Sequence, residues 1–230
     1  MLLKDLWNLL EKQLFLTHST EDLFNPYRDN DPLLDLPNGN QIRKQNLLNY
    51  INSFPKKPPV LVLGEAPGIK GCRFSGVPFT SEEQLCNKKL PFEGLQSSNK
   101  TVPYSENTAT IFWKVMLPYY HKIFVWNCVP FHPHKKRQNK TNRKPTQKEI
   151  TTFLPLLKEI ISLLQPQFIL AIGRNAEFAL QAIEISPLYI RHPSHGGAKI
   201  FEEKIKNFFN TLSMKKSIIP PSLSSSYLFP

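Results

Sequence analysis

The stretch VLVLGEAPGIKGCRFSGVPFT, from Val60 to Thr80, decides which fold the sequence predicts. Its first residues, Val60 to Leu63, are apolar, follow a Lys-Lys-Pro-Pro break and stop at Gly64, which is typical of a buried strand in a parallel sheet. The loop that follows is rich in glycine and proline, and such loops bind ligands at the carboxyl ends of strands in open α/β sheets. It matches neither the Walker loop nor the dinucleotide-binding motif.

Outside this stretch, short apolar runs alternate with helical patterns. Besides 60–63, strands are expected at 123–126, 168–172 and 188–190. Helices are expected at 2–16, 42–51, 111–116, 150–165, 174–183 and 198–212, with a short turn at 81–82, an irregular segment at 18–40 and a loop at 87–105. Thr146 and Glu149 form a capping box. This alternation predicts an α/β fold, a three-layer α/β/α sandwich with a central four-stranded, mainly parallel sheet.

Composition favours a single folded domain over residues 1–212, with an N-terminal helical part at 1–55 and a flexible Ser/Pro-rich tail at 213–230. No apolar run reaches the length of about 18 residues that a membrane span needs. The first residues read as an amphipathic helix and not as a signal peptide. The 3 cysteines are too few for a disulfide framework or a four-cysteine metal site, so a reducing cytoplasm is expected. The chain is also expected to act as a monomer without metal or cofactor.

The chain is strongly basic, with a net charge of +11 and a pI near 9.6. Such an excess indicates a polyanionic partner, nucleic acid before membrane, although a basic protein with no charged partner remains an alternative. The segment 132–148 contains seven Lys or Arg residues and no acidic residue. We expect DNA phosphates to be contacted there by Lys135, Lys136, Arg137 and Arg143, the alternative being a solvated loop.

Chemically useful side chains follow the predicted strands. The loop after Gly64, Asn127 and His192 all come after strand carboxyl ends, which meet at one edge of a parallel sheet. Phe79 offers a flat apolar face, Asn127 offers both a donor and an acceptor, and His192 can donate to a developing anion. Together they fit an enzyme that acts on a flipped-out nucleobase.

At these residues the chain resembles the uracil-DNA glycosylase superfamily, most closely its thermostable bacterial and archaeal branch, family 4. The resemblance covers about 60–209 and rests on motifs in the expected order: Gly64-Glu65-Ala66-Pro67-Gly68, Gly76-Val77-Pro78-Phe79, Asn127, Asn142-Arg143-Lys144-Pro145, Leu170-Ala171-Ile172-Gly173-Arg174-Asn175-Ala176 and His192-Pro193-Ser194.

The resemblance implies a monofunctional DNA glycosylase that removes uracil and leaves an abasic site, with no need of a lysine. It implies catalytic roles for His192, Glu65 and Asn127. The base would be bound by Gly64, Ala66, Pro67, Gly68, Phe79 and Asn127. Phe79 would stack on the base, Asn127 would bind its polar edge and His192 would stabilise charge on O2, assisted by backbone N–H groups near Glu65 and Ala66. The DNA would also be contacted by Ser194, His195 and Gly196.

The chain departs from the family pattern at three places. Phe131 and Phe153 stand where family 4 has two of its iron–sulfur cysteines, so we expect apolar packing in place of the cluster. The aspartate that orients water in other branches falls at Ala66, which leaves Glu65 as the only carboxylate of the motif, with its role open. A tyrosine that excludes thymine elsewhere falls at Gly68, so either Phe74 or Arg73 fills that space or the site admits 5-substituted bases.

Two alternatives to uracil removal stay open at this point. One is a glycosylase for another base, such as hypoxanthine, xanthine or a 5-substituted pyrimidine. The other is a DNA-binding protein that keeps the fold and has lost catalysis, which the missing carboxylate favours and the presence of Phe79, Asn127 and His192 opposes.

Overall fold

The centre of the protein is a four-stranded parallel sheet. A computed structural model describes residues 2–218. The strand order is β3-β2-β5-β6, and all three neighbouring pairs run parallel. The strands are β2 (Val60–Gly64), β3 (Ile123–Asn127), β5 (Phe168–Ile172) and β6 (Leu188–Ile190). All four strands predicted from the sequence are therefore present.

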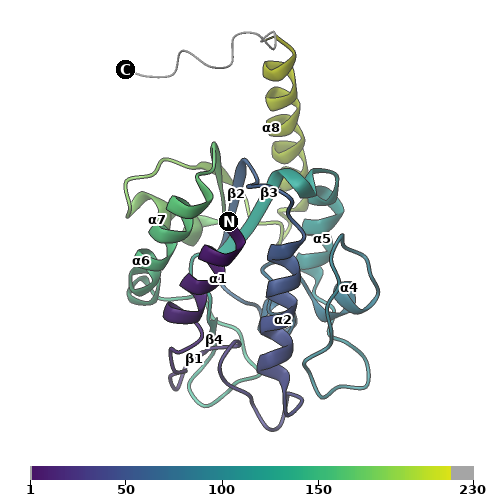
Figure 1. Cartoon of the computed structure of the whole chain (residues 1–230), viewed down its shortest axis with the longest axis vertical. Helices are drawn as coiled ribbons and strands as arrows, with labels where there is room; N and C mark the ends of the chain where they lie inside the picture. The colour runs from purple at the N-terminus through teal and green to yellow at the C-terminus, as the bar shows by residue number, and fades with distance from the viewer. Residues whose placement is uncertain (1, 219–230) are drawn as a thin grey trace.

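Helices cover both faces of this sheet. α6 and α7 lie on one side, and α5 lies on the other together with α8, which projects beyond the body of the molecule (Figure 1). This arrangement confirms the predicted three-layer α/β/α sandwich. The helices are α1 (Leu2–Gln13), α2 (Gly39–Asn52), α3 (Cys72–Ser75), α4 (Glu82–Cys86), α5 (Asn107–Met116), the 3-10 helix η1 (Leu117–Lys122), α6 (Gln147–Leu164), α7 (Arg174–Gln181) and α8 (Ala198–Ile218).

The register of the sheet brings the strand carboxyl ends together. Gly64 at the end of β2 lies opposite Asn127 at the end of β3, and Ile172 of β5 lies opposite Ile190 of β6. The residues that follow these ends consequently reach one edge of the sheet. α6 begins where predicted, since the Thr146 hydroxyl accepts a hydrogen bond from the backbone N–H of Glu149 and the Glu149 carboxylate accepts one from the N–H of Thr146.

The N-terminal part and the glycine-rich loop differ from the expected secondary structure. The segment 18–40, expected to be irregular, contributes β1 (Leu23–Phe24), which pairs antiparallel with β4 (His132–Pro133). Strands of two residues show no alternation in the sequence, so only the tertiary structure brings them together. A short helix, α3, also forms within the glycine-rich loop and ends at Gly76, whose φ of 75° is the left-handed conformation that favours glycine.

The C-terminal helix is longer than predicted. α8 continues to Ile218, so residues 213–218, expected to begin a flexible tail, are helical. The apolar stripe ends near 212, and the helix then continues on residues such as Met214 and Lys215, which have good helix propensity. The remainder of the expected tail, 219–230, lies outside the described residues.

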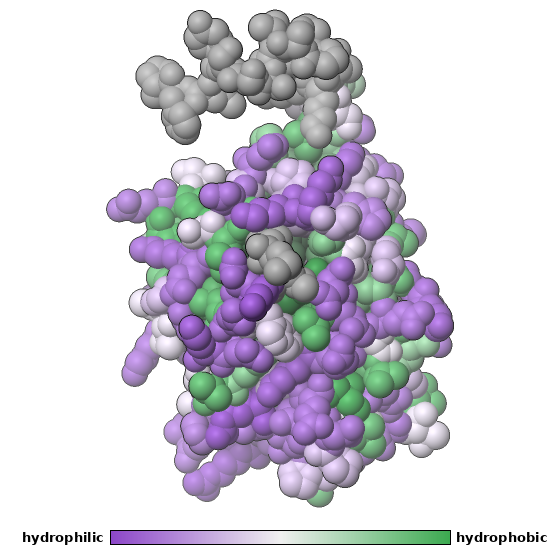
Figure 2. Space-filling view, in the orientation of Figure 1, coloured by the Kyte–Doolittle hydropathy of each residue, from purple (hydrophilic) through white to green (hydrophobic). Residues whose placement is uncertain are grey.

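One cluster of buried hydrophobic side chains joins the elements, from Leu6 on α1 through the sheet to Phe209 on α8. The face shown in Figure 2 is mainly hydrophilic, with its hydrophobic residues in scattered groups. Within residues 2–218, no helix combines the length and the apolar character that crossing a membrane requires.

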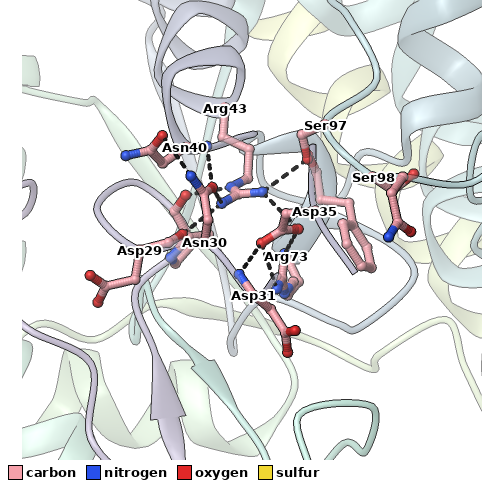
Figure 3. Close-up of polar contacts among 12 residues, drawn as sticks. Asp29, Asn30, Asp31, Asp35, Asn40, Arg43, Arg73, Ser97 and Ser98 are labelled. Carbon is pink, nitrogen blue, oxygen red and sulfur yellow. Dashed lines mark hydrogen bonds and ion pairs between the residues drawn. The ribbon is translucent and has the colours of Figure 1, made fainter. Parts of the chain in front are cut away.

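A buried ionic cluster, formed by Asp35, Arg43 and Arg73 and called here the Asp35 cluster, fastens the glycine-rich loop to the N-terminal part. Both guanidinium groups reach the Asp35 carboxylate (Figure 3), and all three side chains are fully buried. Arg73 belongs to α3 and Arg43 to α2. The cluster thus ties the loop after β2 to α2 and to the segment before it.

Candidate active site

A cavity of about 740 Å³ opens at the carboxyl edge of the sheet. This volume is in the range of small-molecule sites. Of the residues predicted to form the site, the cavity is lined by Glu65, Ala66, Pro67, Gly68, Phe79, Asn127, Arg143, His192, Ser194 and His195. The lining lacks Gly64, Lys135, Lys136, Arg137 and Gly196.

Phe79 presents an aromatic wall to the cavity. Its ring stacks on Phe112 of α5, with centroids 4.3 Å apart and an angle of 18° between the planes. Phe112 therefore fixes the plane of the Phe79 ring from behind. The Phe79 backbone has a φ of 52°, an unusual conformation for an aromatic residue and one that is often found at functional sites. A fixed flat ring of this kind can stack on a planar ligand.

Asn127 brings an unpaired amide to the same cavity. Asn127 is only 4% exposed, yet its side-chain amide makes no hydrogen bond with any residue in the described range 2–218. Gly64 explains how Asn127 and Phe79 fit together, because a Cβ at Gly64 would lie 2.7 Å from Asn127 Oδ1 and 2.8 Å from Phe79 Cζ. Gly64 thus acts from behind the cavity by leaving room for two of its walls.

His192 is held as a neutral hydrogen-bond donor. The backbone N–H of Ser194 donates to His192 Nδ1 at 3.2 Å, and the Ser194 hydroxyl lies 2.7 Å from the same nitrogen. Nδ1 is therefore an acceptor, and the ring proton belongs on Nε2. Burial, reinforced by the charge of His195, lowers the pKa of His192 to about 4. The imidazole is neutral at pH 7, with its Nε2–H available in the cavity lining.

Glu65 lies in the cavity wall directly after β2. Burial raises the pKa of its carboxyl, and this rise is opposed by a hydrogen bond with the Asn175 side chain and by the charge of Lys144. The Glu65 carbonyl oxygen accepts a hydrogen bond from the backbone N–H of Val129 at 3.0 Å. Backbone and side chain are both engaged, which fixes the position of the carboxylate.

Two side chains from the basic segment anchor the glycine-rich loop. His132 Nδ1 donates to the Pro67 carbonyl oxygen at 2.7 Å, and Asn142 Oδ1 accepts from the backbone N–H of Ile69 at 2.9 Å. Burial lowers the pKa of His132 to about 4, so this histidine is neutral. The segment 132–142 therefore supports the loop in addition to any contact with DNA.

The predicted phosphate contacts divide into engaged and exposed groups. Arg143 binds the Glu149 carboxylate at 2.8 Å and the His134 carbonyl oxygen at 2.9 Å, and it pairs with Asp22 at 3.2 Å. Its donors are thereby committed within the protein, which gives it a structural position and argues against the predicted phosphate contact. By contrast, residues 135–137 are exposed and are not part of the cavity lining. Two of them, at 136 and 137, pair loosely with Glu21 at 3.4 and 3.8 Å.

The loop after β6 forms one rim of the cavity. The Ser194 hydroxyl forms hydrogen bonds with His192 Nδ1 at 2.7 Å and with His195 Nδ1 at 2.9 Å. Ser194 therefore orients the imidazole of His192, the catalytic candidate. His195 and Gly196 are exposed and have φ values of 51° and 76°. A Cβ added at Gly196 would meet nothing within 4 Å. These two residues form an exposed edge, and their contact with DNA stays a prediction.

The cavity also contains residues to which the sequence analysis gave no role in the site. Basic residues at its mouth are exposed and come from separate elements: Lys144, Arg174 and Arg191. Lys144 places a lysine in the lining, although the predicted mechanism needs none. Glu106 adds a second carboxyl group, from the residue before α5. These residues are far apart in the sequence, so the sequence alone did not show that they meet in one cavity. Glu106 in addition belongs to no motif.

The space beside Gly68 is occupied, but not by the side chains expected. Phe74 is fully buried and stacks on Tyr104, and Arg73 is held by Asp35, so neither lines the cavity. Instead, a Cβ at Gly68 would lie 3.3 Å from the Glu106 carboxyl carbon and closer still to one of its oxygens. The space beside Gly68 is therefore not open, while the tolerance of 5-substituted bases stays a prediction.

The two phenylalanines at the positions of iron–sulfur cysteines pack together. The rings of Phe131 and Phe153 meet edge to face with centroids 4.9 Å apart, and both side chains are buried. The expected apolar packing at this place is confirmed. Among the described residues, no group of three or more His, Cys, Asp or Glu side chains is arranged to hold a metal ion.

Comparisons with known proteins agree with this fold. Among curated protein sequences, none matches the chain. Among solved structures, the crystal structure of wild-type Pedobacter heparinus SMUG2 is similar, with a TM-score of 0.65 and 14% sequence identity over 93% of this chain and 98% of that chain. At this identity the similarity concerns the fold alone. The placement closest to family 4 stays a prediction.

The sequence model of a protein family supplies the assignment. The model described as "Uracil DNA glycosylase superfamily" matches residues 51–229, more than half of the chain. The matched region contains the sheet and all the residues that line the cavity. The chain therefore belongs to the uracil DNA glycosylase superfamily and is a DNA glycosylase, a hydrolase that acts on N-glycosyl bonds.

Proposed function

We propose that the protein is a monofunctional glycosylase that removes uracil from DNA and leaves an abasic site. The observation that carries this proposal is the meeting of three groups in one cavity: the fixed ring of Phe79, the unpaired amide of Asn127 and the neutral Nε2–H of His192. A planar base with adjacent donor and acceptor atoms satisfies all three.

Each group has a distinct task in the proposed reaction. Phe79 stacks on the flipped base, while the Asn127 amide accepts from N3–H and donates to O4 of uracil. The Nε2–H of His192 donates to O2, where negative charge develops as the electron pair of the glycosidic bond leaves with the base. Because His192 is already neutral, its hydrogen bond strengthens with that charge and no proton has to be removed first.

The basic rim fits a nucleic-acid substrate. Lys144, Arg174 and Arg191 are exposed residues of the cavity lining, and Arg191 donates a hydrogen bond to the His195 carbonyl oxygen at 3.4 Å. Contacts of these cations with phosphates would hold the strand on both sides of the flipped nucleotide. Action as a monomer in the cytoplasm stays a prediction from composition.

The test is one incubation series with defined oligonucleotides. Each carries uracil, hypoxanthine, xanthine or a 5-substituted pyrimidine, and abasic sites are revealed by alkaline cleavage. We expect release of uracil by the wild type and strong loss of release by His192→Ala prepared in the same way. His121→Ala, at an exposed histidine outside the cavity lining, is the matched control and retains activity.

Two outcomes contradict the proposal in different ways. Release of another base with uracil left intact refutes the uracil assignment, while release of no base from any substrate supports the catalytically inactive alternative. Strand breaks without alkali in the wild type, abolished in Lys144→Gln, would refute the monofunctional assignment, because Lys144 lines the cavity and would then act as a nucleophile.

A further inference from the structure

Glu106 directs a carboxyl group into the candidate active site. It is the N-cap residue of α5, but its side chain makes no capping hydrogen bond to that helix. Instead the carboxyl lies over the glycine-rich loop. A Cβ at Gly68 or Gly71 would approach its carboxyl carbon to 3.3 or 2.7 Å. The two glycines therefore leave the space in which this carboxyl sits.

The Glu106 carboxyl has no partner in the described part of the chain, where it makes neither a hydrogen bond nor an ion pair. Burial raises its pKa to about 7, and no neighbouring charge contributes to that shift. Cys72 on α3 faces it, and burial raises the pKa of this thiol, so the thiol is neutral. The other titratable groups in the cavity wall are Glu65, Arg143, Lys144, Arg174, Tyr189, Arg191, His192 and His195.

The Glu106 side chain is half-buried and lines the cavity, so its carboxyl, which has no partner among residues 2–218, is free to meet a ligand or a reacting molecule there. Glu65 is the other carboxyl in the lining. It already has a hydrogen bond with the Asn175 side chain, and the positive charge of Lys144 favours its ionised form. Of the two, Glu106 is the one whose oxygens are both free to accept a proton.

We propose that Glu106 is the catalytic residue that accepts a proton from the attacking water. This inference rests on the proposed function. As the bond between C1′ and the base breaks, its electron pair leaves with the base, whose O2 charge is stabilised by His192. Water forms the new C1′–O bond and transfers one proton to the Glu106 carboxylate, which later releases it to solvent, while the departed base anion takes up one proton from solvent. The products are the free base and an abasic site, and no other reactant is needed.

The test compares single-turnover rates of the wild type, Glu106→Gln and Glu65→Gln from pH 5 to 9 on a uracil-containing oligonucleotide. For the wild type we expect a rate that rises with pH and levels off above about 7, because the ionised form of Glu106 is the active one. Glu106→Gln should be about 10²–10⁴-fold slower and should no longer show this increase of rate with pH, called here the pH limb. Its affinity for the DNA should change only a few-fold. Glu65→Gln should keep the limb.

A second variant guards against a purely structural effect. Glu106→Asp keeps a carboxylate, so it should recover part of the rate and restore the pH limb, whereas a merely structural role predicts neither. Added formate should likewise raise the rate of Glu106→Ala, because the small anion can occupy the vacated space and accept the proton.

The outcomes separate this inference from the proposed function. Wild type that releases uracil, together with Glu106→Gln that keeps the pH limb and a rate within a few-fold of wild type, overturns the role of Glu106 alone. Loss of the pH limb in Glu65→Gln but not in Glu106→Gln also overturns the proposed role of Glu106. Wild type that releases no base from any oligonucleotide overturns the proposed function and this role with it.

Discussion

Replacing Asp35 by alanine should destabilise the fold by about 3–5 kcal/mol, because it leaves buried arginines without their counter-charge. Arg43 Nη1 lies 3.1 Å from the Asp35 carboxylate, and Arg73 binds it through both Nη atoms at 2.6 and 3.1 Å. All three side chains are fully buried, so water cannot replace the missing carboxylate without opening the structure.

The loss of Asp35 does not affect the two arginines equally. Arg43 keeps neutral acceptors, which include Ser97 Oγ at 3.0 Å and Asn30 Oδ1 at 3.0 Å. Arg73 has no other hydrogen-bond acceptor among residues 2–218, and its Nε is already without a partner. Most of the destabilisation therefore arises at Arg73, and the expected total stays within the range of about 3–5 kcal/mol for one broken buried pair instead of doubling it.

Urea unfolding followed by tryptophan fluorescence measures this destabilisation, since the chain contains 3 tryptophans. Glu202→Ala, which removes an exposed pair with Lys206, is the matched control and should leave the midpoint nearly unchanged. Adding Arg73→Met to Asp35→Ala should restore part of the stability, because it removes the unpaired charge and keeps an apolar stem. A change below about 1 kcal/mol for Asp35→Ala, or no recovery in the double variant, would refute this reasoning.

Three further predictions concern catalysis and DNA binding. Gly64→Ala should lower the single-turnover rate by about 10²-fold, because the new methyl group displaces Phe79 and Asn127, and a wild-type rate would contradict this. Neutralising residues 135–137 should reduce the slope of log affinity against log salt by up to about 0.9 for each phosphate that is no longer neutralised, equally on damaged and undamaged duplex; an unchanged slope means that these residues are only solvated. His192→Ala should reduce the rate by about 10²–10³ with little change in DNA affinity, and a rate within a few-fold of wild type would remove His192 from the mechanism.

Local patterns in the sequence were sufficient for the architecture. The four strands of the sheet are runs of neighbouring apolar residues bounded by glycine, proline or polar residues, and α6 begins at a capping box within four consecutive residues. Such signals act between near neighbours in the chain, so they survive without knowledge of the packing. Because parallel strands end at one edge, the convergence of Asn127 and His192 with the glycine-rich loop followed from the same patterns.

The tertiary structure alone decided the partners of individual side chains. Glu106 reaches the cavity from a residue that directly follows the predicted loop at 87–105, Arg143 turns to Glu149 and Asp22, and Lys144 lines the mouth of the cavity. The two-residue strands β1 and β4 meet across more than a hundred residues. Contacts between segments so far apart depend on how the helices and loops pack on the sheet. Hydrophobic periodicity indicates local secondary structure and does not indicate that packing. The sequence by itself thus determined the sheet and the family motifs at its edge, while the carboxyl group proposed here to activate water became visible only once the chain was folded.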